Sequence, residues 1–289
     1  MEAAENALEI EGLTKAYKGF CLKQISFTVP KGTIVGFIGE NGAGKSTTLN
    51  LILGLARSDG GVIQIAGQAV SDANSAIRET IGVVFDGNNF PGNDTPDTLR
   101  VFLRALYPAW DDAVYQKLLA RLDLPAGKRI RQFSKGMRMK LALAAAFSHH
   151  ARLLILDEPT SGLDPIVREE ILDLLLEYVE DAENSVLISS HITSDLNRIA
   201  DYIVFIHDGA IVFEKPKDEL IYQYGILRCT TEQYGMLDPA DMIASRKQAH
   251  EWEALVRDRK ALAAKYPEVV IDAATLDEIM LLYVKGTRL

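Results

Sequence analysis

Residues 39–46 combine the glycines, the lysine and the hydroxyl group that a phosphate-binding loop needs. The segment reads Gly39-Glu40-Asn41-Gly42-Ala43-Gly44-Lys45-Ser46 and continues with Thr47. Glycines let backbone N–H groups wrap phosphate oxygens, Lys45 can neutralise charge on the β- and γ-phosphates, and Ser46 can offer its hydroxyl to Mg²⁺. The segment is therefore predicted to bind ATP and Mg²⁺. A glycine-rich turn without a ligand is the alternative, which would require the spacing, the lysine and the flanking elements to coincide.

Two adjacent carboxylates follow an apolar run further along the chain. Asp157 and Glu158 come directly after Leu153-Leu154-Ile155-Leu156, which indicates a strand that delivers both acids at its carboxyl end, where open α/β sheets bind ligands. Adjacent residues point in opposite directions there, so Asp157 is predicted to hold Mg²⁺ through its water shell while Glu158 polarises the attacking water. The alternative is that the pair only opens a turn before Pro159.

The glycine-rich loop and the two carboxylates need a framework of buried strands to position them. A strand is expected from Thr33 to Ile38, before the glycine-rich loop, and a helix from Lys45 to about Leu53, after it. Long helical patterns separate further apolar runs that are typical of buried strands, at residues 81–85, 153–156 and 186–188. The expected fold class is α/β with a parallel sheet.

Two helices and a hairpin are expected around this core. Apolar residues at helical spacing predict two helices between Pro96 and Leu124, separated near Pro108. The runs on either side of Asp208-Gly209 predict a hairpin, because both turn residues tolerate a positive φ. Beyond residue 221 the phosphate chemistry ends, and short strands are expected near residues 253–256 and 269–271.

Two more motifs follow the carboxylates. Ser161-Gly162-Leu163-Asp164 comes next, and His191 follows a third strand. In this order the motifs resemble those of the ATP-binding cassette (ABC) family, at its D-loop and switch-histidine positions. The resemblance implies a P-loop NTPase of the ABC type, with an N-terminal antiparallel β subdomain and a helical insert at about residues 90–145, in a nucleotide-binding domain at residues 1–220. Residues 221–289 would then be a small C-terminal α+β accessory domain.

The family also carries a signature loop of the type Leu-Ser-Gly-Gly-Gln, and Phe133-Ser134-Lys135-Gly136-Met137 stands at its position. Ser134 and Gly136 resemble the residues that clamp the γ-phosphate, whereas the lysine and the methionine depart from the commonest form. A signature loop lies too far along the fold to complete its own site. The resemblance therefore implies a second nucleotide-binding subunit, in a homodimer or a related heterodimer, with ATP sandwiched between the two. Asp164 is assigned to the same nucleotide site.

The resemblance also assigns the adenine contact and the metal ligands. Tyr17 stands where the family has its adenine-stacking aromatic residue, with Phe20 as the alternative, because a π face suits a base without reading its edges. Asp86 follows the run at residues 81–85, where the family usually has a glutamine that senses Mg²⁺ and the membrane partner. It is assigned to the metal together with Ser46 and Asp157, since a carboxylate can take a hard cation through water.

The switch histidine completes the predicted catalytic group. His191 is expected to hydrogen-bond the γ-phosphate, because an imidazole can donate to an anion and report its loss. Together with Glu158 and Lys45 it forms the set of residues assigned to catalysis. Four other histidines are expected to be ordinary surface or core residues without a metal cluster: His149, His150, His207 and His250.

Charge and cysteine usage argue against nucleic acid and against an oxidising compartment. The formal net charge is −9, which repels polyanions at long range. Cys21 and Cys229 lie far apart in the sequence and indicate neither a disulfide framework nor a zinc site, which fits a reducing cytosol. Basic residues surround the signature loop, and a solvated helix face explains most of them better than phosphate contact; they are Lys128, Arg129, Arg131, Lys135, Arg138 and Lys140.

The chain offers no membrane-spanning segment of its own. Its apolar runs are much shorter than the roughly 20 residues that span a bilayer, and Met1–Glu11 shows no signal peptide. The ending at residues 275–283 resembles bacterial export-type cassette subunits, the antibiotic and multidrug group. In that group a separate transmembrane permease binds the ATPase. The resemblance implies an ATP-hydrolysing transporter subunit, peripheral on the cytoplasmic face of the cell membrane.

Two other classes of protein share part of this pattern. Soluble cassette ATPases that remodel ribosomes or DNA use the same motifs without a membrane partner, but they usually carry two cassettes or long heptad coils, and this sequence has neither. Small-molecule P-loop kinases share the loop at residues 39–46 but need no signature, D-loop or switch histidine. The ABC transporter subunit is therefore the preferred interpretation.

Overall fold

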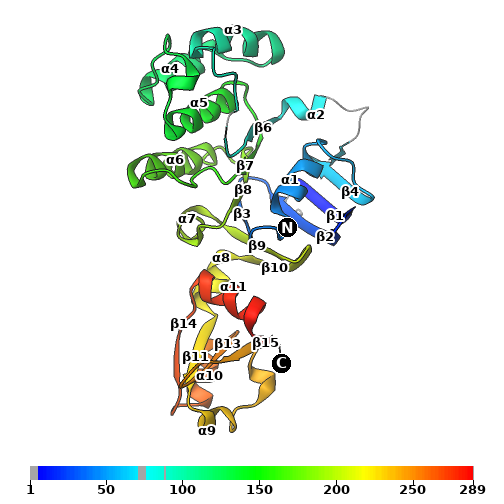
Figure 1. Ribbon diagram of the computed structural model, residues 1–289, viewed down its shortest axis with the longest axis vertical. Helices are drawn as coiled ribbons and strands as arrows, with labels where there is room; N and C mark the ends of the chain where they lie inside the picture. The colour runs from blue at the N-terminus through cyan, green and yellow to red at the C-terminus, as the bar shows by residue number, and fades with distance from the viewer. Residues whose placement is uncertain (1–5, 71–75, 88, 289) are drawn as a thin grey trace.

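Three sheets organise the chain. The computed structural model describes residues 6–70, 76–87 and 89–288. An antiparallel four-stranded sheet lies near the N-terminus, a six-stranded sheet forms the centre, and a five-stranded sheet follows towards the C-terminus. Figure 1 shows the helical insert and the C-terminal sheet at opposite ends of the long axis, with the central sheet between them.

The central sheet has the strand order β10-β9-β3-β8-β7-β6. Its strands are parallel except for β10, which pairs antiparallel with β9. This topology confirms the expected α/β fold, including the strand before the glycine-rich loop. The strands are β3 (Ile34–Ile38), β6 (Ile81–Val84), β7 (Leu153–Asp157), β8 (Ser185–Ser190), β9 (Tyr202–His207) and β10 (Ala210–Pro216).

Both faces of the central sheet are buried. Ile34 and Ile38 of β3 belong to one hydrophobic cluster, which includes the helices of the insert. Val35 and Phe37 of the same strand belong to a second cluster, shared with the N-terminal sheet. Strands covered on both sides read as continuous apolar runs rather than as alternating patterns, which is why the sequence predicted them.

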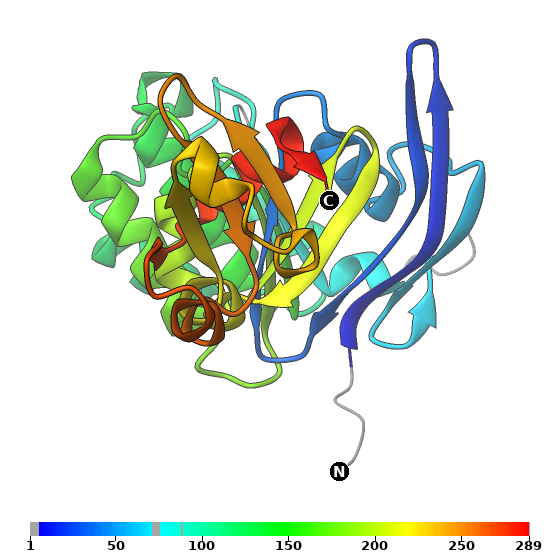
Figure 2. The same cartoon turned by 90° about the horizontal axis from the view of Figure 1, so that it is seen from below.

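The N-terminal subdomain covers one face of the central sheet. Its strands β1 and β2 form a long hairpin, seen at the right of Figure 2, and β1 also pairs antiparallel with β4. The phosphate-loop helix packs its Leu49 and Ile52 into the same cluster. The elements are β1 (Asn6–Tyr17), β2 (Phe20–Pro30), α1 (Lys45–Ile52), β4 (Gly60–Ile65), β5 (Gln68–Ala69) and α2 (Ala76–Glu79).

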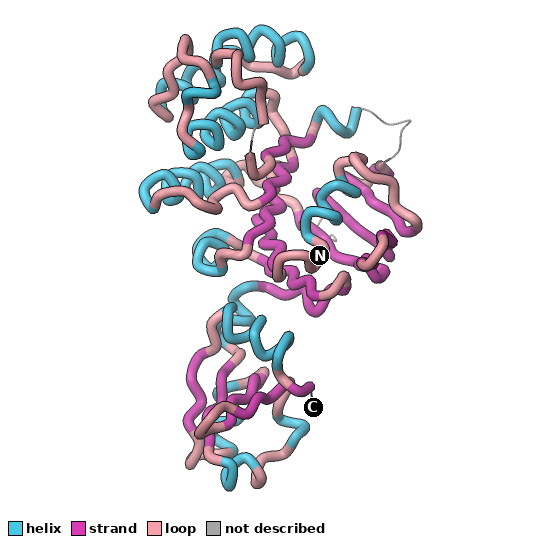
Figure 3. The backbone as a smooth tube through the Cα atoms, in the orientation of Figure 1, coloured by secondary structure: helices cyan, strands magenta, loops and turns pink. Residues whose placement is uncertain are grey.

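Helices cover the opposite face, as the tube in Figure 3 shows. The two helices predicted around Pro108 are present, and each begins at a side-chain cap, Thr95 and Asp111 respectively. His149 is buried and stacks on Tyr107, and burial lowers the pKa of its imidazole. The elements are α3 (Pro96–Leu106), α4 (Asp112–Arg121), η1 (Ile130–Gln132), α5 (Lys135–Ser148), α6 (Pro165–Tyr178) and α7 (Thr193–Ile199).

Within the described residues, no helix combines the length and the apolarity needed to cross a bilayer.

The chain beyond α8 (Lys217–Tyr222) builds the third sheet, in the order β14-β11-β13-β12-β15. The sequence predicted two of these strands and missed three, because β11 and β12 are short and partly polar and β15 has two residues. The strands are β11 (Gly225–Cys229), β12 (Ala244–Lys247), β13 (Trp252–Val256), β14 (Val270–Ala273) and β15 (Thr287–Arg288). The helices are α9 (Thr231–Tyr234), η2 (Pro239–Asp241), α10 (Arg259–Lys265) and α11 (Leu276–Lys285).

The predicted hairpin between β9 and β10 also supports the phosphate loop. Asp208 and Gly209 have φ values of 46° and 73°, as a two-residue turn with positive φ at both positions requires. The Gly209 amide donates to the Ala43 carbonyl oxygen at 3.0 Å, inside the phosphate loop. A Cβ atom at Gly209 would lie 2.0 Å from the Cys21 carbonyl oxygen. The turn is therefore wedged between β2 and the loop, with room only for glycine.

Replacing Gly209 should cost more than its backbone conformation alone explains. In Gly209→Ala the alanine would adopt a left-handed conformation, which costs about 1–2 kcal/mol of folding free energy. Its Cβ atom would also clash with the backbone, which costs about 1–3 kcal/mol more. The free energy of unfolding, measured in urea, should fall by both amounts.

Gly67 offers a matched control in the turn between β4 and β5. Its φ is also 73°, yet a Cβ atom there would meet nothing within 4 Å. Gly67→Ala should therefore show the cost of the left-handed conformation without the clash. Equal losses in the two variants would mean that the contact with Cys21 relaxes freely.

Candidate functional site

The phosphate loop connects the end of β3 to the start of α1. Gly42 and Gly44 have φ values of 84° and 120°, which only glycine adopts at low cost. Gly39 packs so closely that a Cβ atom would lie 2.4 Å from the Ile206 carbonyl oxygen. The loop therefore needs three of its glycines for backbone reasons, apart from any ligand.

Lys45 lies almost fully buried at the start of α1, with 6% of its surface exposed. Its Nζ donates to the Gly39 carbonyl oxygen at 2.7 Å and to the Glu40 carbonyl oxygen at 3.3 Å. It also lies 3.8 Å from Oε1 of Glu158. A buried ammonium needs such partners, and the loop holds this one where an anion entering the loop would meet it.

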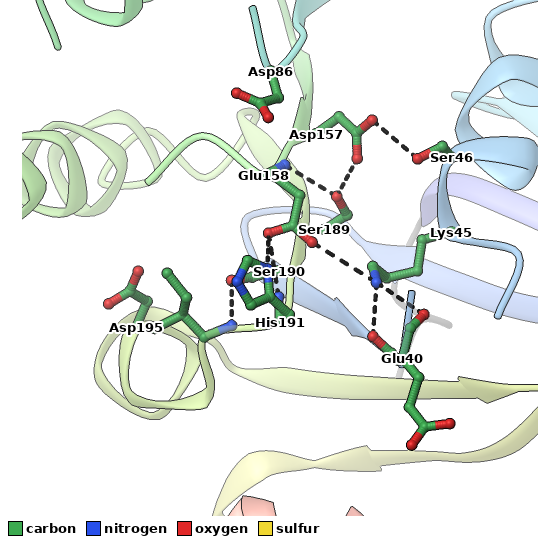
Figure 4. Close-up of polar contacts among 12 residues, drawn as sticks. Glu40, Lys45, Ser46, Asp86, Asp157, Glu158, Ser189, Ser190, His191 and Asp195 are labelled. Atoms are coloured by element: carbon green, nitrogen blue, oxygen red, sulfur yellow. Dashed lines mark hydrogen bonds and ion pairs between the residues drawn. The ribbon is translucent and has the colours of Figure 1, made fainter. Parts of the chain in front are cut away.

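A hydroxyl and a carboxylate oxygen lie together beside the loop. Ser46 donates from Oγ to Oδ2 of Asp157 at 3.2 Å, and Ser189 donates from Oγ to Oδ1 of Asp157 at 2.5 Å (Figure 4). Both Ser46 and Asp157 carry hard oxygen donors of the kind that Mg²⁺ prefers. The Ser46 hydroxyl and the Asp157 carboxylate would therefore suit Mg²⁺, which binds such oxygens directly or through its waters.

Glu158 is held in an uncommon backbone conformation. Its φ is 51°, a region that costs non-glycine residues of the order of 1–3 kcal/mol and that clusters at functional sites. Its amide donates to the carbonyl oxygen and to Oγ of Ser189, each at 3.1 Å. This turn sends the Glu158 side chain away from Asp157, although the two residues are adjacent (Figure 4).

The Glu158 carboxylate lies between a lysine and a histidine. Nδ1 of His191 is 2.5 Å from Oε2 of Glu158, and the His191 amide donates to the same oxygen at 3.3 Å. Oε1 faces Lys45. The three residues that the sequence assigned to catalysis are thus neighbours at the carboxyl edge of the sheet: one begins α1, and the other two directly follow β7 and β8.

Asp86 points elsewhere in this conformation. Its Oδ1 forms an ion pair with Nζ of Lys135 at 2.7 Å, and Figure 4 shows its carboxylate turned away from Ser46 and Asp157. Across the described ranges, no group of three or more histidine, cysteine, aspartate or glutamate residues is arranged to hold a metal ion. The metal ligands predicted from the sequence are therefore present as one pair, Ser46 with Asp157, and one separate residue.

The signature and D-loop residues begin two adjacent helices. Ser134 caps α5 by accepting from the Met137 amide at 3.2 Å, and Asp164 caps α6 by accepting from the Val167 amide at 3.1 Å. Gly136 lets the helices approach, because a Cβ atom there would lie 2.7 Å from Cγ1 of Val167. Helices α5 and α1 lie on opposite faces of the central sheet (Figure 1), so the signature is separated from the phosphate loop of its own chain.

The two aromatic candidates for the adenine contact differ in exposure. Tyr17 ends β1 with 49% of its surface exposed, and its ring lies 5.5 Å from Nζ of Lys15. Phe20 is partly buried and packs under the loop, with its Cζ 3.0 Å from the position of a Cβ atom on Gly44. Tyr17 is thus the more exposed of the two rings, and exposure of a ring face is what stacking requires.

Sequence reasoning missed Ser189 as a functional residue. It is fully buried, and it binds both the Asp157 carboxylate and the Glu158 backbone. The signal was available in the pair Ser189-Ser190 directly before His191, but a serine inside an apolar strand has no motif of its own.

The comparisons with known proteins agree with this geometry. Residues 22–161 match the family described as ABC transporter. The chain is 33% identical over 218 residues to the ABC transporter ATP-binding protein YtrB of Bacillus subtilis (strain 168), covering 75% of this chain and 74% of that protein. It is 34% identical to the bacitracin transport ATP-binding protein BcrA of Bacillus licheniformis, covering 72% of this chain and 69% of that protein.

Solved structures of the same family are also similar to this chain. An ATP-binding subunit of an ABC transporter superimposes with a TM-score of 0.66 at 28% identity, covering 80% of this chain and 94% of that one. The order of the motifs, the sheet topology and the extent of these matches agree. The chain belongs to the ATP-binding proteins of the ABC transporter family and is an ATP-hydrolysing subunit of that kind.

Proposed function

We propose that this chain closes on a second nucleotide-binding subunit around ATP and thereby energises a separate membrane-spanning export permease. The observation that carries the proposal is the position of Glu158, between Lys45 and His191 and beside the Ser46–Asp157 pair. A carboxylate held there can activate water next to a bound γ-phosphate. A role in transport is supported by the name of BcrA, which states bacitracin transport, and export is the direction that we propose.

A second subunit is required because the signature is on the wrong face of its own sheet. Ser134 and Gly136 begin α5, across the sheet from α1. A head-to-tail partner would bring its own α5 N-terminus to the γ-phosphate, where the helix dipole favours an anion. Asp164, at the start of α6, would border the same interface. Either an identical copy or a related subunit satisfies this requirement.

Within the closed site, each residue has a distinct task. Gly39 to Thr47 supply backbone and side-chain donors to the phosphates, and Lys45 neutralises the β- and γ-phosphate charge. Tyr17 stacks on the adenine. Mg²⁺, held by Ser46 and Asp157, would neutralise developing charge on the phosphates.

Hydrolysis then follows from the positions of Glu158 and His191. Glu158 accepts a proton from the attacking water as the water oxygen bonds to the γ-phosphorus, and the bond to the leaving ADP oxygen breaks. His191 turns its ring N–H from Glu158 to the γ-phosphate when ATP is bound, so that loss of the phosphate returns it to the carboxylate. The chain would work at the cytoplasmic face of the membrane, where a permease supplies the spanning segments.

Asp86 joins the metal ligands only after it leaves Lys135. The two residues are paired at 2.7 Å, and both side chains are partly exposed. An exposed ion pair contributes about 0–1 kcal/mol, so closure around ATP and Mg²⁺ can break it. Asp86 would then reach the ion through a water molecule, in place of the glutamine that is usual in this family.

Glu158→Gln should abolish hydrolysis and keep ATP binding. Removing the group that accepts the proton should lower kcat by about 10²- to 10⁴-fold, and the variant should accumulate as an ATP-bound dimer in light scattering. Wild-type ATPase activity should rise more steeply than linearly with protein concentration, because two copies share each site.

Glu170→Gln is the matched control, since Glu170 lies on α6 and pairs with Lys140, outside the site. It should retain full activity. Three results together would contradict the shared site and favour a kinase: the chain stays a monomer, its activity rises linearly with protein concentration, and Glu158→Gln remains active.

The Mg²⁺ dependence of the ATPase should report the role of Asp86. Asp86→Asn should raise the Mg²⁺ concentration for half-maximal activity by about tenfold, as the loss of an outer ligand typically does. Lys135→Met frees Asp86 and should lower that concentration, by at most about fivefold. The double variant should behave like Asp86→Asn. Lys140→Met, on the same helix, is the control, and an unchanged Mg²⁺ titration in Asp86→Asn would remove Asp86 from the metal ligands.

A further inference from the structure

Helix α7 follows the switch histidine and lacks a cap of its own. It begins at Thr193, two residues after His191, and Ile192 at its N-cap position makes no side-chain hydrogen bond to it. The Thr193 hydroxyl instead donates to Oδ2 of Asp277 at 2.9 Å. Asp277 lies in the first turn of α11, the last helix of the chain, so the start of α7 is tied to the C-terminal domain.

The same two helices share a hydrophobic contact. Leu276, Ile279 and Leu282 of α11 are buried in the main core cluster, together with Leu196 and Ile199 of α7. Figure 1 shows α11 on the side of the C-terminal sheet that faces the central sheet. Helix α11 therefore belongs to the core of the ATPase as much as to its own sheet, and its position limits where α7 can lie.

On its other side, α7 is bound to α6. Arg168 donates from Nε to Oδ1 of Asp195 at 2.6 Å and from Nη2 to Oγ of Ser194 at 3.0 Å. Asp195 has 3% of its surface exposed, so its charge is costly to leave without the arginine. The start of α7 is thus held by Arg168 on one side and by Asp277 on the other.

Only a few residues separate the Thr193–Asp277 contact from the catalytic group. Ser190 is the last residue of β8, and its Oγ accepts from the Ile192 amide at 2.9 Å. The His191 backbone and ring both contact Glu158. Because only Ile192 stands between His191 and Thr193, a shift at the start of α7 must move the histidine relative to the carboxylate.

We propose that Asp277 is a positioning residue for His191, acting through Thr193, so that the C-terminal domain adjusts the rate of ATP hydrolysis. The inference rests on the proposed role of His191 as the γ-phosphate switch. A groove of about 380 Å³ runs beside the contact, lined in part by Asn197, Ile221 and Thr275. Thr193 and Asp277 also line this groove, and the hydrogen bond between them is solvent-exposed, so it can open while the buried contacts of α11 hold.

Breaking this hydrogen bond should change catalysis without changing ATP binding. Thr193→Val removes the donor and Asp277→Ala removes the acceptor, so each should lower kcat by about two- to tenfold, the effect of one hydrogen bond. The KM for ATP should stay within about a factor of two of the wild-type value, because neither residue is among those assigned to the nucleotide. Thr193→Ser keeps the hydroxyl and should therefore keep the wild-type kcat. The variant that combines Thr193→Val with Asp277→Ala should be no slower than the slower of the two single variants.

Asp241→Ala is the matched control for the domain itself. Asp241 accepts from Nζ of Lys265 and from the Tyr266 hydroxyl, each at 2.6 Å, within the C-terminal domain and away from α7. It should lower the melting temperature at least as much as Asp277→Ala while leaving kcat unchanged. If Asp241→Ala lowers kcat equally, or Asp277→Ala leaves kcat unchanged, the domain acts only by packing and the inference is wrong.

His191→Ala separates this inference from the proposed function. If that variant keeps full activity, the switch role of His191 fails; if it is inactive while Asp277→Ala is fully active, the positioning role alone fails. The imidazole NMR resonances give a direct readout, since the chain has five histidines and His191→Ala assigns the one in question. That resonance should shift in Thr193→Val and Asp277→Ala but not in Asp241→Ala.

Discussion

Alternate residues of β3 face two different hydrophobic clusters, and β7, β8 and β9 divide their side chains in the same way. A sheet with two apolar faces must be covered on both, here by the helices on one side and by the β subdomain on the other. The segments that follow β3, β7 and β8 all leave the sheet at the carboxyl edge, because these strands are parallel. The phosphate loop, Asp157, Glu158 and His191 meet there because each ends or directly follows a strand of the same buried sheet.

The polar groups at that edge depend on one another once the sheet has placed them. Lys45 is buried and would be costly to leave unpaired, so the loop carbonyls and Glu158 surround it. Ser189 holds the Asp157 side chain and the Glu158 backbone at the same time. This arrangement directs two adjacent carboxylates to different partners, one to the Ser46 hydroxyl and one to His191.

The C-terminal sheet and its helices are joined to the central sheet by packing as well as by chain connection. Tyr283 of α11 contacts the rings of Phe205 and Phe213, which lie in β9 and β10. Ile226 and Leu255 face the main cluster, whereas Leu227 and Val256 face a small cluster of the domain's own. One face of the third sheet is therefore part of the ATPase core, which gives a local contact such as Thr193–Asp277 a rigid support.

The sequence alone determined the fold class and the parallel strands, and it predicted the residues assigned to the phosphates and to catalysis. These features depend on short-range spacing: glycines at particular intervals, apolar runs, and acids placed directly after a strand. It also predicted the Asp208-Gly209 turn, because φ preferences are local. The strands β11, β12 and β15 were missed, since short and partly polar strands are stabilised by neighbours far away in the chain.

Only the tertiary structure paired Asp86 with Lys135, placed Ser189 in contact with both Asp157 and Glu158, and joined Thr193 to Asp277. Each of these contacts links segments brought together by packing, and no pattern along the chain records which side chains will meet across it.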